Sequence, residues 1–338
     1  MNSKPKITIT EISKIAGVSK TTVSRVLNNK PDVDSETRQK ILSLIEQFDY
    51  QPNAFAKAIS LQKTNHVGLI IPHNAEYVFS NSFYTEVMHG VSVEVDRQGY
   101  YLVLCYAHEV NYLDIYRQKR VDGFVLLSPG SYHIHIIDSL NKEGVPFVST
   151  ARISDEGSMT YVDVDNYYGA TLAMEHLIEL GHKRIAYIGK PTLKSSQDRL
   201  RGYQAVMQKY NLPLHDEWMQ ITDNSSAEGG YSYTVKLLQS NNIPSAIFLA
   251  NDMQAIGAIN AIKENGLRVP EDISVIGFDD IPLAKYTTPA LTTIRQPTFQ
   301  KGVNAARLLI EMLETGQPIS SLTMDVELIV RESTGQIS

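Results

Sequence analysis

Near the N-terminus, the residues best suited to binding chemistry are hydrogen-bond formers on one short segment. If this segment is a helix, five of these residues lie on its solvent-facing side: Lys20, Thr21, Thr22, Ser24 and Arg25. None is acidic, so such a face can donate to phosphate oxygens and to acceptors on base edges in the DNA major groove. The alternative is the solvated face of an ordinary helix pair.

A second group of candidates is rich in side-chain oxygens. Asp279-Asp280 and Asn251-Asp252 each come at the end of an apolar run that reads as a buried strand. Open α/β sheets bind ligands at the carboxyl ends of their strands, and a carboxylate can accept hydrogen bonds from adjacent sugar hydroxyls. Asp and Asn are also favoured helix N-caps, so capping is the alternative for all four.

Catalytic motifs are absent from the sequence. It has no phosphate-binding Gly-rich loop, no Gly-x-Ser-x-Gly elbow and no His-Glu-x-x-His. The single cysteine, Cys105, lies in an apolar run and is expected to be a buried small hydrophobe. His133 and His135 are spaced like a metal pair but have no further ligand nearby. The sequence therefore predicts no enzyme, no cofactor and no metal site.

The donor-rich face needs helices to position it, and the sequence before it predicts the first of them. Thr8 is the expected N-cap, and Glu11 can complete a capping box with it. Apolar residues then recur at helical spacing: Ile9, Ile12, Ile15 and Ala16. Gly17 follows, where a left-handed turn favours glycine.

Two further helices are expected. Ser19 caps the second, whose buried stripe is Val23, Val26 and Leu27, and Asp34 caps the third. The apolar positions of the third helix are Ile41, Leu44, Ile45 and Phe48. A helix, a glycine-containing turn and a helix with a donor-rich face are typical of a helix-turn-helix that reads the major groove.

Charge is distributed unevenly along the chain. The net charge is −6, but residues 1–65 hold ten Lys or Arg against six Asp or Glu, a net +4 that leaves −10 for the remainder. A small basic unit on an acidic body suits a DNA-binding protein, because neutralisation of phosphates dominates DNA affinity.

The remaining chain alternates apolar strand-like runs with amphipathic helices in two series. This pattern predicts an α/β fold with two doubly wound parallel sheets, hence two lobes with a ligand-binding cleft. With 338 residues, of which 43% are hydrophobic, the chain can form two or three domains. No signal peptide and no membrane-spanning run is present, so a cytoplasmic protein is expected.

The segment AGVSKTTVSRVLNN, followed by Pro52-Asn53, closely resembles the headpiece of the lac repressor/galactose repressor family. The resemblance continues through RQKRVDGFVLLSP, HLIELGHKRIAYIG, DRLRGYQAVM and SVIGFDDI in a core similar to periplasmic sugar-binding proteins. It implies a headpiece over residues 1–51, a hinge helix or linker over 52–64 and a core over 65–338. The implied lobes are about 65–162 plus 293–322, and about 163–292 plus 323–338.

For DNA, the resemblance implies Lys20 and Thr21 as variable base readers and Arg25 as the common one. Residues implied to hold phosphates are Thr8, Ser19, Thr22, Ser24 and Asn28. Asn53, Lys57 and Ile59 are the implied hinge contacts, with Ile59 as a minor-groove wedge where the family usually has leucine. The alternative for the hinge is a plain linker.

For the effector, the resemblance divides the oxygen-rich pairs. Asn251 and Asp279 are implied contacts, whereas Asp252 and Asp280 are implied to cap or support. Other implied contacts are Asp165, Ser195, Arg199 and Gln296, with Phe83 and Tyr84 as an aromatic wall. Core packing of the first core helix is the alternative for the aromatic pair, above all for Tyr84.

The chain is therefore predicted to be a transcription regulator, most simply a repressor. Its predicted partners are double-stranded operator DNA, a sugar-like small-molecule effector and a second copy in a homodimer, with no membrane. The alternative is a solute-binding protein with no DNA role. The sequence departs from the family pattern in two places. The segment 107–120 is several residues shorter than usual. The loop expected over residues 74–80 is long, and it is followed by Asn81-Ser82-Phe83 where the family has Asn-Pro-Phe.

Overall fold

The computed structural model describes most of the chain. The described residues are 7–27, 29–51, 63–71, 75–106, 111–128, 134–154, 159–189, 193–222 and 224–337. The chain divides into two compact units, Met1–Thr64 and Asn65–Ser338. No helix in the described residues is long and apolar enough to cross a bilayer.

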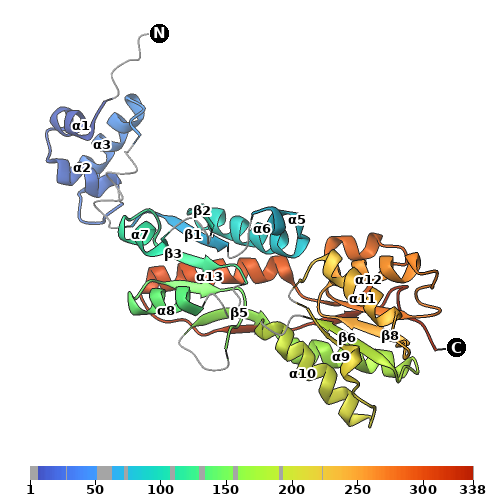
Figure 1. The fold of residues 1–338 in the computed structure, drawn as a ribbon. Coiled ribbons are helices and arrows are strands. Elements are labelled where there is room, and N and C mark those ends of the chain that lie inside the picture. Colours follow the sequence, from blue (N-terminus) through green and yellow to red (C-terminus); the bar gives the residue numbers. More distant parts are fainter. Residues whose placement is uncertain are drawn as a thin grey trace. The chain divides into compact units, whose positions relative to one another are not determined.

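The described residues of the first unit form three helices (Figure 1). These are α1 (Ile9–Ala16), α2 (Lys20–Leu27) and α3 (Ser35–Gln47). Thr8 and Glu11 form a complete capping box at α1, and Gly17 ends that helix with a φ of 73°. The Asp34 side chain accepts from the Thr37 backbone N–H at the start of α3. The predicted caps and turn of this unit are confirmed.

A small apolar core holds the three helices together. Its fully buried members are Ile12, Ala16, Val23, Val26 and Ile41. The expected burial is wrong for Ile15 and Phe48, which are 50% and 41% exposed. A unit of three short helices covers only a narrow stripe of each one, so apolar residues at the edge of the stripe stay in water.

Two six-stranded sheets form the framework of the second unit. Their strand orders are β11-β5-β4-β3-β1-β2 and β12-β10-β9-β8-β6-β7. The strands are β1 (His66–Ile71), β2 (Tyr101–Tyr106), β3 (Gly123–Leu126), β4 (Phe147–Ser149), β5 (Thr160–Val164), β6 (Ile185–Gly189), β7 (Met219–Ile221), β8 (Ala246–Leu249), β9 (Ser274–Asp279), β10 (Thr292–Arg295), β11 (Leu322–Met324) and β12 (Glu327–Ile329). All described pairings are parallel except that of β10 with β12. The predicted doubly wound α/β core is confirmed, with one antiparallel edge strand.

Helices cover both faces of each sheet (Figure 1). They are α5 (Ala75–Ser80), α6 (Ser82–Arg97), α7 (Tyr112–Arg117), α8 (Ile134–Lys142), α9 (Asn166–Glu179), α10 (Lys194–Lys209), α11 (Ala227–Leu238), α12 (Asp252–Glu264) and α13 (Thr298–Thr315), with short 3-10 turns at Asp216–Trp218 and Pro282–Tyr286. On the first sheet, α6 and α13 pack on one face and α7 and α8 on the other. On the second, α9 and α10 oppose α11 and α12.

Helix α13 comes from near the C-terminus yet packs closely against α6 of the first lobe (Figure 1). A Cβ on Gly90 would lie 2.0 Å from the Phe299 carbonyl oxygen, and one on Gly302 would lie 2.0 Å from the Val87 oxygen. Only glycine permits this approach of two backbones. The close contact brings the start of α13 to the carboxyl ends of the first sheet's strands.

The chain passes between the two sheets three times, after β5, after β10 and after β11. Strand β10 therefore belongs to the second lobe and β11 to the first. Each passage lies slightly beyond the boundary expected from the sequence, at residues 162, 293 and 322.

Several elements differ from those expected. Residues 75–80, expected as a loop, form α5. Strands β7, β11 and β12 were not anticipated because each has three residues, too few for a periodic pattern. The sequence does not predict strand β5, because the charged residue Asp163 interrupts its apolar run.

Candidate DNA-binding face and effector pocket

Helix α2 presents the donor-rich face that the sequence predicts. Lys20, Thr21 and Arg25 are exposed, while Val23 and Val26 are buried against the other two helices. Ser19 caps α2, because its Oγ accepts from the Thr22 backbone N–H at 3.0 Å. The Ser19 and Thr22 hydroxyls also share a 2.9 Å hydrogen bond. Ser19 and Thr22, both predicted to hold phosphates, are therefore hydrogen-bonded to each other at the start of α2.

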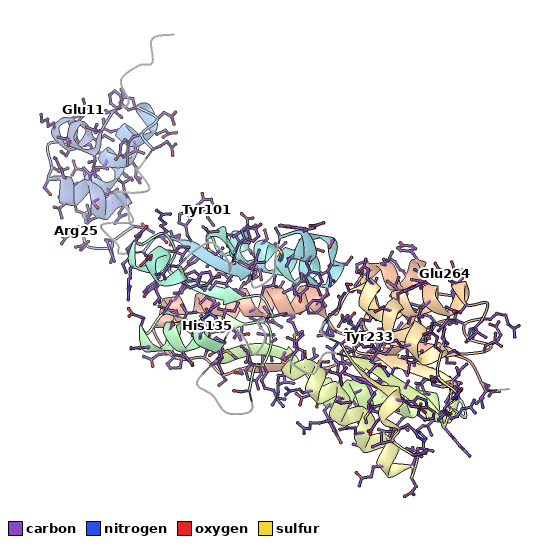
Figure 2. All side chains as sticks on the ribbon, viewed as in Figure 1. Glu11, Arg25, Tyr101, His135, Tyr233 and Glu264 are labelled. Atoms are coloured by element: carbon purple, nitrogen blue, oxygen red, sulfur yellow. The ribbon has the colours of Figure 1, made fainter. Side chains whose placement is uncertain are left out.

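Arg25 has an intramolecular partner. Its guanidinium lies 2.9 Å from the Asp32 carboxylate, and the two side chains are 54% and 51% exposed. Arg25 and Glu11 both lie at the surface of the first unit (Figure 2). An ion pair this exposed is weak and can be exchanged for a DNA acceptor.

Four of the predicted DNA contacts lie outside the described residues. They are Asn28, Asn53, Lys57 and Ile59. Thr8, by contrast, is described, and its hydroxyl and backbone N–H both bond to Glu11 at the start of α1.

In the second unit, a pocket lies between the carboxyl ends of the two sheets. Seven of the eight predicted effector residues line it: Phe83, Tyr84, Ser195, Arg199, Asn251, Asp279 and Gln296. They come from α6, α10, the ends of β8 and β9 and the segment after β10. Parallel strands end at one edge of each sheet, which is why positions so far apart in sequence meet here.

Asp279 is held in an unusual backbone conformation. It ends β9 with a φ of 127°, and Asp280 follows with a φ of 55°. Positive φ costs a non-glycine residue energy and persists only where surrounding structure enforces it. Here Gln296 bonds to Asp279 twice, through its backbone N–H and through Nε2 at 2.5 Å from Oδ1. The strained bend places the carboxylate on the pocket wall.

The second member of each oxygen-rich pair has structural partners elsewhere in the second lobe. Asp252 is fully buried and accepts from the Ile281 N–H and the Thr293 hydroxyl, and burial raises the pKa of its carboxyl to about 8. Asp280 pairs with two arginines, one of them Arg331 at 2.6 Å. Neither lines the pocket.

Asn251 caps a helix and also lies at the pocket. Its side chain accepts from the Gln254 backbone N–H at 2.8 Å and thereby caps α12. It also lines the pocket. Its Oδ1 is used by the helix, and its Nδ2 donates one of two N–H groups to Gln254 Oε1 at 3.2 Å.

Arg199 is buried at the centre of the site. Its Nε donates to Asn166 at 2.9 Å, Nη1 donates to the Ala250 carbonyl, and the guanidinium stacks 3.6 Å from the centre of the Phe278 ring. Asp279 lies 3.6 Å away. Burial lowers the pKa of Arg199, and the nearby carboxylate opposes that shift. For the Asp279 carboxyl, burial acts in the opposite direction and raises the pKa to about 6, because burial disfavours the charged form of either group.

Three aromatic side chains form one wall of the pocket. Phe83 and Tyr84 meet edge to face at 5.3 Å, and Tyr77 of α5 meets Tyr84 at 5.6 Å. Tyr84 is 7% exposed and belongs to the core of the first lobe as well as to the pocket lining. Flat apolar faces of this kind can cover a sugar ring.

Asp165 is the predicted effector residue that the structure does not bring to this pocket. It caps α9 by accepting from the Tyr168 N–H at 2.8 Å and lines a neighbouring hollow. Asp163, two residues earlier, lines the pocket instead.

Comparisons with known proteins agree with this architecture. Residues 8–53 match the family model described as bacterial regulatory proteins, lacI family, and residues 174–334 match the periplasmic binding protein-like domain. The probable HTH-type transcriptional repressor ExuR of Bacillus subtilis is 35% identical, over 98% of this chain and 99% of its own. The chain belongs to the LacI family of bacterial regulatory proteins.

Solved structures of LacI-family proteins have the same fold. The lac repressor dimer bound to operator and the anti-inducer ONPF matches with a TM-score of 0.82 and 26% identity, over 98% of this chain and 100% of that one. The complex of the transcriptional regulator CelR with cellobiose matches with a TM-score of 0.73 and 30% identity, over 97% and 99%. The chain is thus a transcription regulator with a helix-turn-helix headpiece and an effector-binding core, and its relatives are named as repressors rather than enzymes.

Helices are present in both segments that are predicted to depart from the LacI-family pattern. Residues 75–80, before Asn81, form α5, and Tyr77 of this helix lines the pocket. Asn81 itself caps α6 by accepting from the Phe83 N–H at 3.0 Å. The short segment after β2 retains only the six-residue helix α7 among its described residues.

Sequence reasoning missed four charged residues that line the pocket of this LacI-family core: Arg152, Asp163, Lys194 and Lys301. A signal existed for Lys301. It precedes the buried Ala305 and Leu308 by four and seven positions, so it lies on the apolar stripe of α13, where a lysine is unexpected. No comparable pattern marks Arg152 or Lys194.

The remaining candidates for chemistry have structural places. Cys105 is buried, as predicted, and burial raises the pKa of its thiol to about 11. His135 lies exposed on α8, and His133 is outside the described residues. The described part of the chain contains no group of three potential metal ligands.

Proposed function

We propose that this LacI-family chain is a repressor whose affinity for operator DNA is set by a small polyhydroxylated effector bound between the lobes. The observation that carries this proposal is the convergence of Arg199, Asn251, Asp279 and Gln296 in one pocket from four separate segments. Carboxylate, amide and guanidinium groups are suited to the paired hydroxyls of a sugar. The related CelR core binds cellobiose, which supports the same class of ligand here.

On the DNA side, Arg25, Lys20 and Thr21 are the proposed base readers. A guanidinium or ammonium can bond to guanine O6 and N7, and a threonine methyl can pack on a thymine methyl. Thr8, Ser19, Thr22, Ser24 and Asn28 are proposed to position the headpiece on phosphates, and Asn53, Lys57 and Ile59 to form the hinge contacts.

A homodimer on a near-palindromic operator is the proposed assembly. One headpiece carries a modest positive charge, so two half-sites are needed for strong binding. The lac repressor, a relative with the same fold, is a dimer on its operator. A cytoplasmic location is part of this proposal, because a repressor must reach operator DNA.

The three passages of chain between the lobes suit a hinge between them. An effector that bonds to residues of both lobes changes how they close. It alters operator affinity only if it binds the DNA-competent and the DNA-incompetent arrangements with different affinities.

The test begins with selection of bound sequences from random duplexes by the full-length protein. A symmetric motif is expected, with a flexible pyrimidine–purine step at its centre. Operator binding is then titrated with a panel of sugars in the native chain and in Asp279→Ala. We expect at least one sugar to change the operator affinity of the native chain and none to change that of Asp279→Ala.

Two results would contradict the proposal. Failure to enrich any motif, with and without the sugar mixture, removes the DNA-binding function. A full sugar response in Asp279→Ala removes the effector from this pocket.

A further inference from the structure

A second hollow, which we call the outer hollow, adjoins the effector pocket on the side of α5. Its first-lobe side is lined by Glu76, Tyr77 and Ser80 of α5 and by Asn81. Tyr77 and Asn81 also line the effector pocket, so the two spaces meet at these side chains. A molecule bound in the pocket can therefore extend past them into the outer hollow.

The second lobe forms the opposite side of the outer hollow. The lining residues there stand at the starts of α11 and α12, and they are Ser226, Ala227, Glu228 and Met253. They follow effector-pocket residues closely in sequence, since Ser225 and Asn251 both line the pocket. The second-lobe wall of the pocket thus continues into the outer hollow, and a group bound there would touch both lobes.

The volumes of the two spaces favour a ligand that occupies both. The effector pocket has a volume of about 90 Å³, and the outer hollow has one of about 380 Å³. A cavity of roughly 150 Å³ holds a benzene ring, so the effector pocket alone is small even for a single sugar ring. A ligand anchored by Arg199 and Asp279 must then extend out of the pocket on one side.

The hollow that Asp165 lines also adjoins the pocket, but charged groups tie the wall between them together. The two spaces share Arg152 and Asp163. The Asp163 carboxylate accepts from the Arg152 backbone N–H at 2.9 Å and from the Lys301 ammonium at 3.0 Å, and the Arg152 guanidinium lies 2.6 Å from Asp198. A ligand would have to break these bonds to pass. The residues shared with the outer hollow are neutral, so the ligand extends toward that side.

The chemistry of the outer hollow suits hydroxyl groups, since none of the described residues that line it is a cation. Glu228 accepts from the Ser226 hydroxyl, and this bond lowers the pKa of the Glu228 carboxyl, which is therefore an acceptor at neutral pH. Glu76 is exposed on the opposite side. Tyr77 and Met253 are half-buried and supply apolar surface, one from each lobe. Acceptors beside apolar faces suit a neutral sugar unit and disfavour an anion.

We propose that the outer hollow is a second subsite of the effector site, and that it holds the second, neutral sugar unit of a disaccharide. The first unit binds to Arg199, Asn251 and Asp279. This inference rests on the proposed function, since it concerns the effector of the same site. Because both lobes line the outer hollow, the contacts of the second unit depend on how the lobes are arranged. The second unit therefore strengthens the effect of the ligand on operator affinity as well as its binding.

The experiment compares disaccharides with their own monosaccharides, by titration calorimetry with the full-length protein. Glucose is compared with cellobiose, maltose and trehalose, and galactose is compared with lactose and melibiose. We expect at least one disaccharide to bind about tenfold or more tightly than each of its monosaccharide units. Several linkages are included because the second ring must pass Tyr77 and Asn81, which not every linkage allows.

Two variants that fill the outer hollow test the assignment to residues. Ala227→Phe fills it from the second lobe and Ser80→Phe from the first, and neither residue lines the effector pocket. Each is expected to reduce the preference for the disaccharide over its monosaccharide about tenfold. Ala205→Phe is the matched control and should keep the preference, because Ala205 is a half-buried alanine on α10 that lines neither space. Far-ultraviolet circular dichroism and Trp218 fluorescence verify that each variant is folded.

Three outcomes overturn the inference and are distinguishable from one another. If both filling variants keep the disaccharide preference, the second unit lies elsewhere and the subsite is wrong. If monosaccharides bind as tightly as their disaccharides, and Asp279→Ala abolishes that binding, the subsite is wrong but the effector pocket and the proposed function stand. If no sugar of either kind binds or changes operator affinity, the subsite is wrong and the sugar effector of the proposed function fails with it.

Discussion

The DNA-binding face and the effector pocket are built in opposite ways. The exposed residues of the DNA-binding face come from one stretch of chain. Its charges are only weakly paired, as in the half-exposed ion pair of Arg25 with Asp32. The effector pocket collects charges from separate segments between Arg152 and Lys301, such as the buried pair of Lys301 with Asp163. A polyanion such as DNA can be bound by exposed cations, whereas a small molecule needs groups fixed in advance. Substitutions should consequently be costly in the pocket and mild on the face.

The largest loss of stability is expected at Asp252, a fully buried residue that follows the pocket residue Asn251. Asp252→Ala leaves the Ile281 N–H and the Thr293 hydroxyl buried without an acceptor, so it should lower the free energy of unfolding by about 3 kcal/mol. Urea unfolding followed by Trp218 fluorescence measures this. Asp252→Asn retains an acceptor oxygen and should cost less. Equal costs for the two variants would show that the hydrogen bonds are not what makes Asp252 important.

On the exposed face, Arg25→Ala should weaken operator binding by about 1–3 kcal/mol and relax base preference in the half-site. Fluorescence anisotropy with the selected operator and with single-base variants gives both quantities. Lys40→Ala is the matched control, because Lys40 is an exposed cation on α3, away from the recognition helix. An unchanged base preference in Arg25→Ala would remove Arg25 as a reader.

The stability of the folded core should also depend on pH, through a histidine outside both the DNA-binding face and the effector pocket. His182 is buried and donates from Nε2 to the Gly335 carbonyl at 3.0 Å, and burial lowers its pKa below 6.5. Below pH 6.5 the unfolded chain therefore binds a proton that the folded chain does not, so stability is present above that pH and is lost as pH falls. The slope is at most about 1.4 kcal/mol per pH unit for one proton.

Urea unfolding between pH 5 and 7, followed by Trp218 fluorescence, measures this slope. His182→Gln should make it shallower, whereas His135→Gln should not, because His135 is exposed on α8 (Figure 2). A slope unchanged in His182→Gln would assign the pH dependence to other groups.

The smallest effect is expected at Asp32. Asp32→Asn releases the Arg25 guanidinium and removes a negative charge near DNA, so operator affinity should rise by about two- to fivefold. The gain should disappear in the double variant with Arg25→Ala. A gain that persists there would come from general charge rather than from the pair.

Much of the fold was predictable because its signals are local. The capping box of Thr8 with Glu11, the turn at Gly17 and the apolar runs of β1 and β8 each depend on neighbours in sequence. Short edge strands such as β7 and β12 form by pairing with a neighbouring strand of the sheet. Their three residues are too few to predict a strand from sequence alone.

The pocket was partly predictable for the same reason. Asn251 and Asp279 stand at strand ends, a position that sequence reveals. Asp163 and Lys301 are 138 positions apart and become partners only when α13 folds back onto the first sheet. The resemblance implied Asp165, whereas Asp163 lines the pocket, because β5 ends at Val164 and Asp165 lies beyond the strand, where it caps α9.

The amino-acid sequence by itself determined the helices of the headpiece, the donor-rich face of α2 and apolar core strands such as β1 and β8, since caps, glycine turns and periodicity act over a few residues. Tertiary structure alone decided the charge of the pocket. Whether a buried lysine or aspartate is neutralised depends on which distant side chain reaches it, and that is settled only when the two lobes are packed.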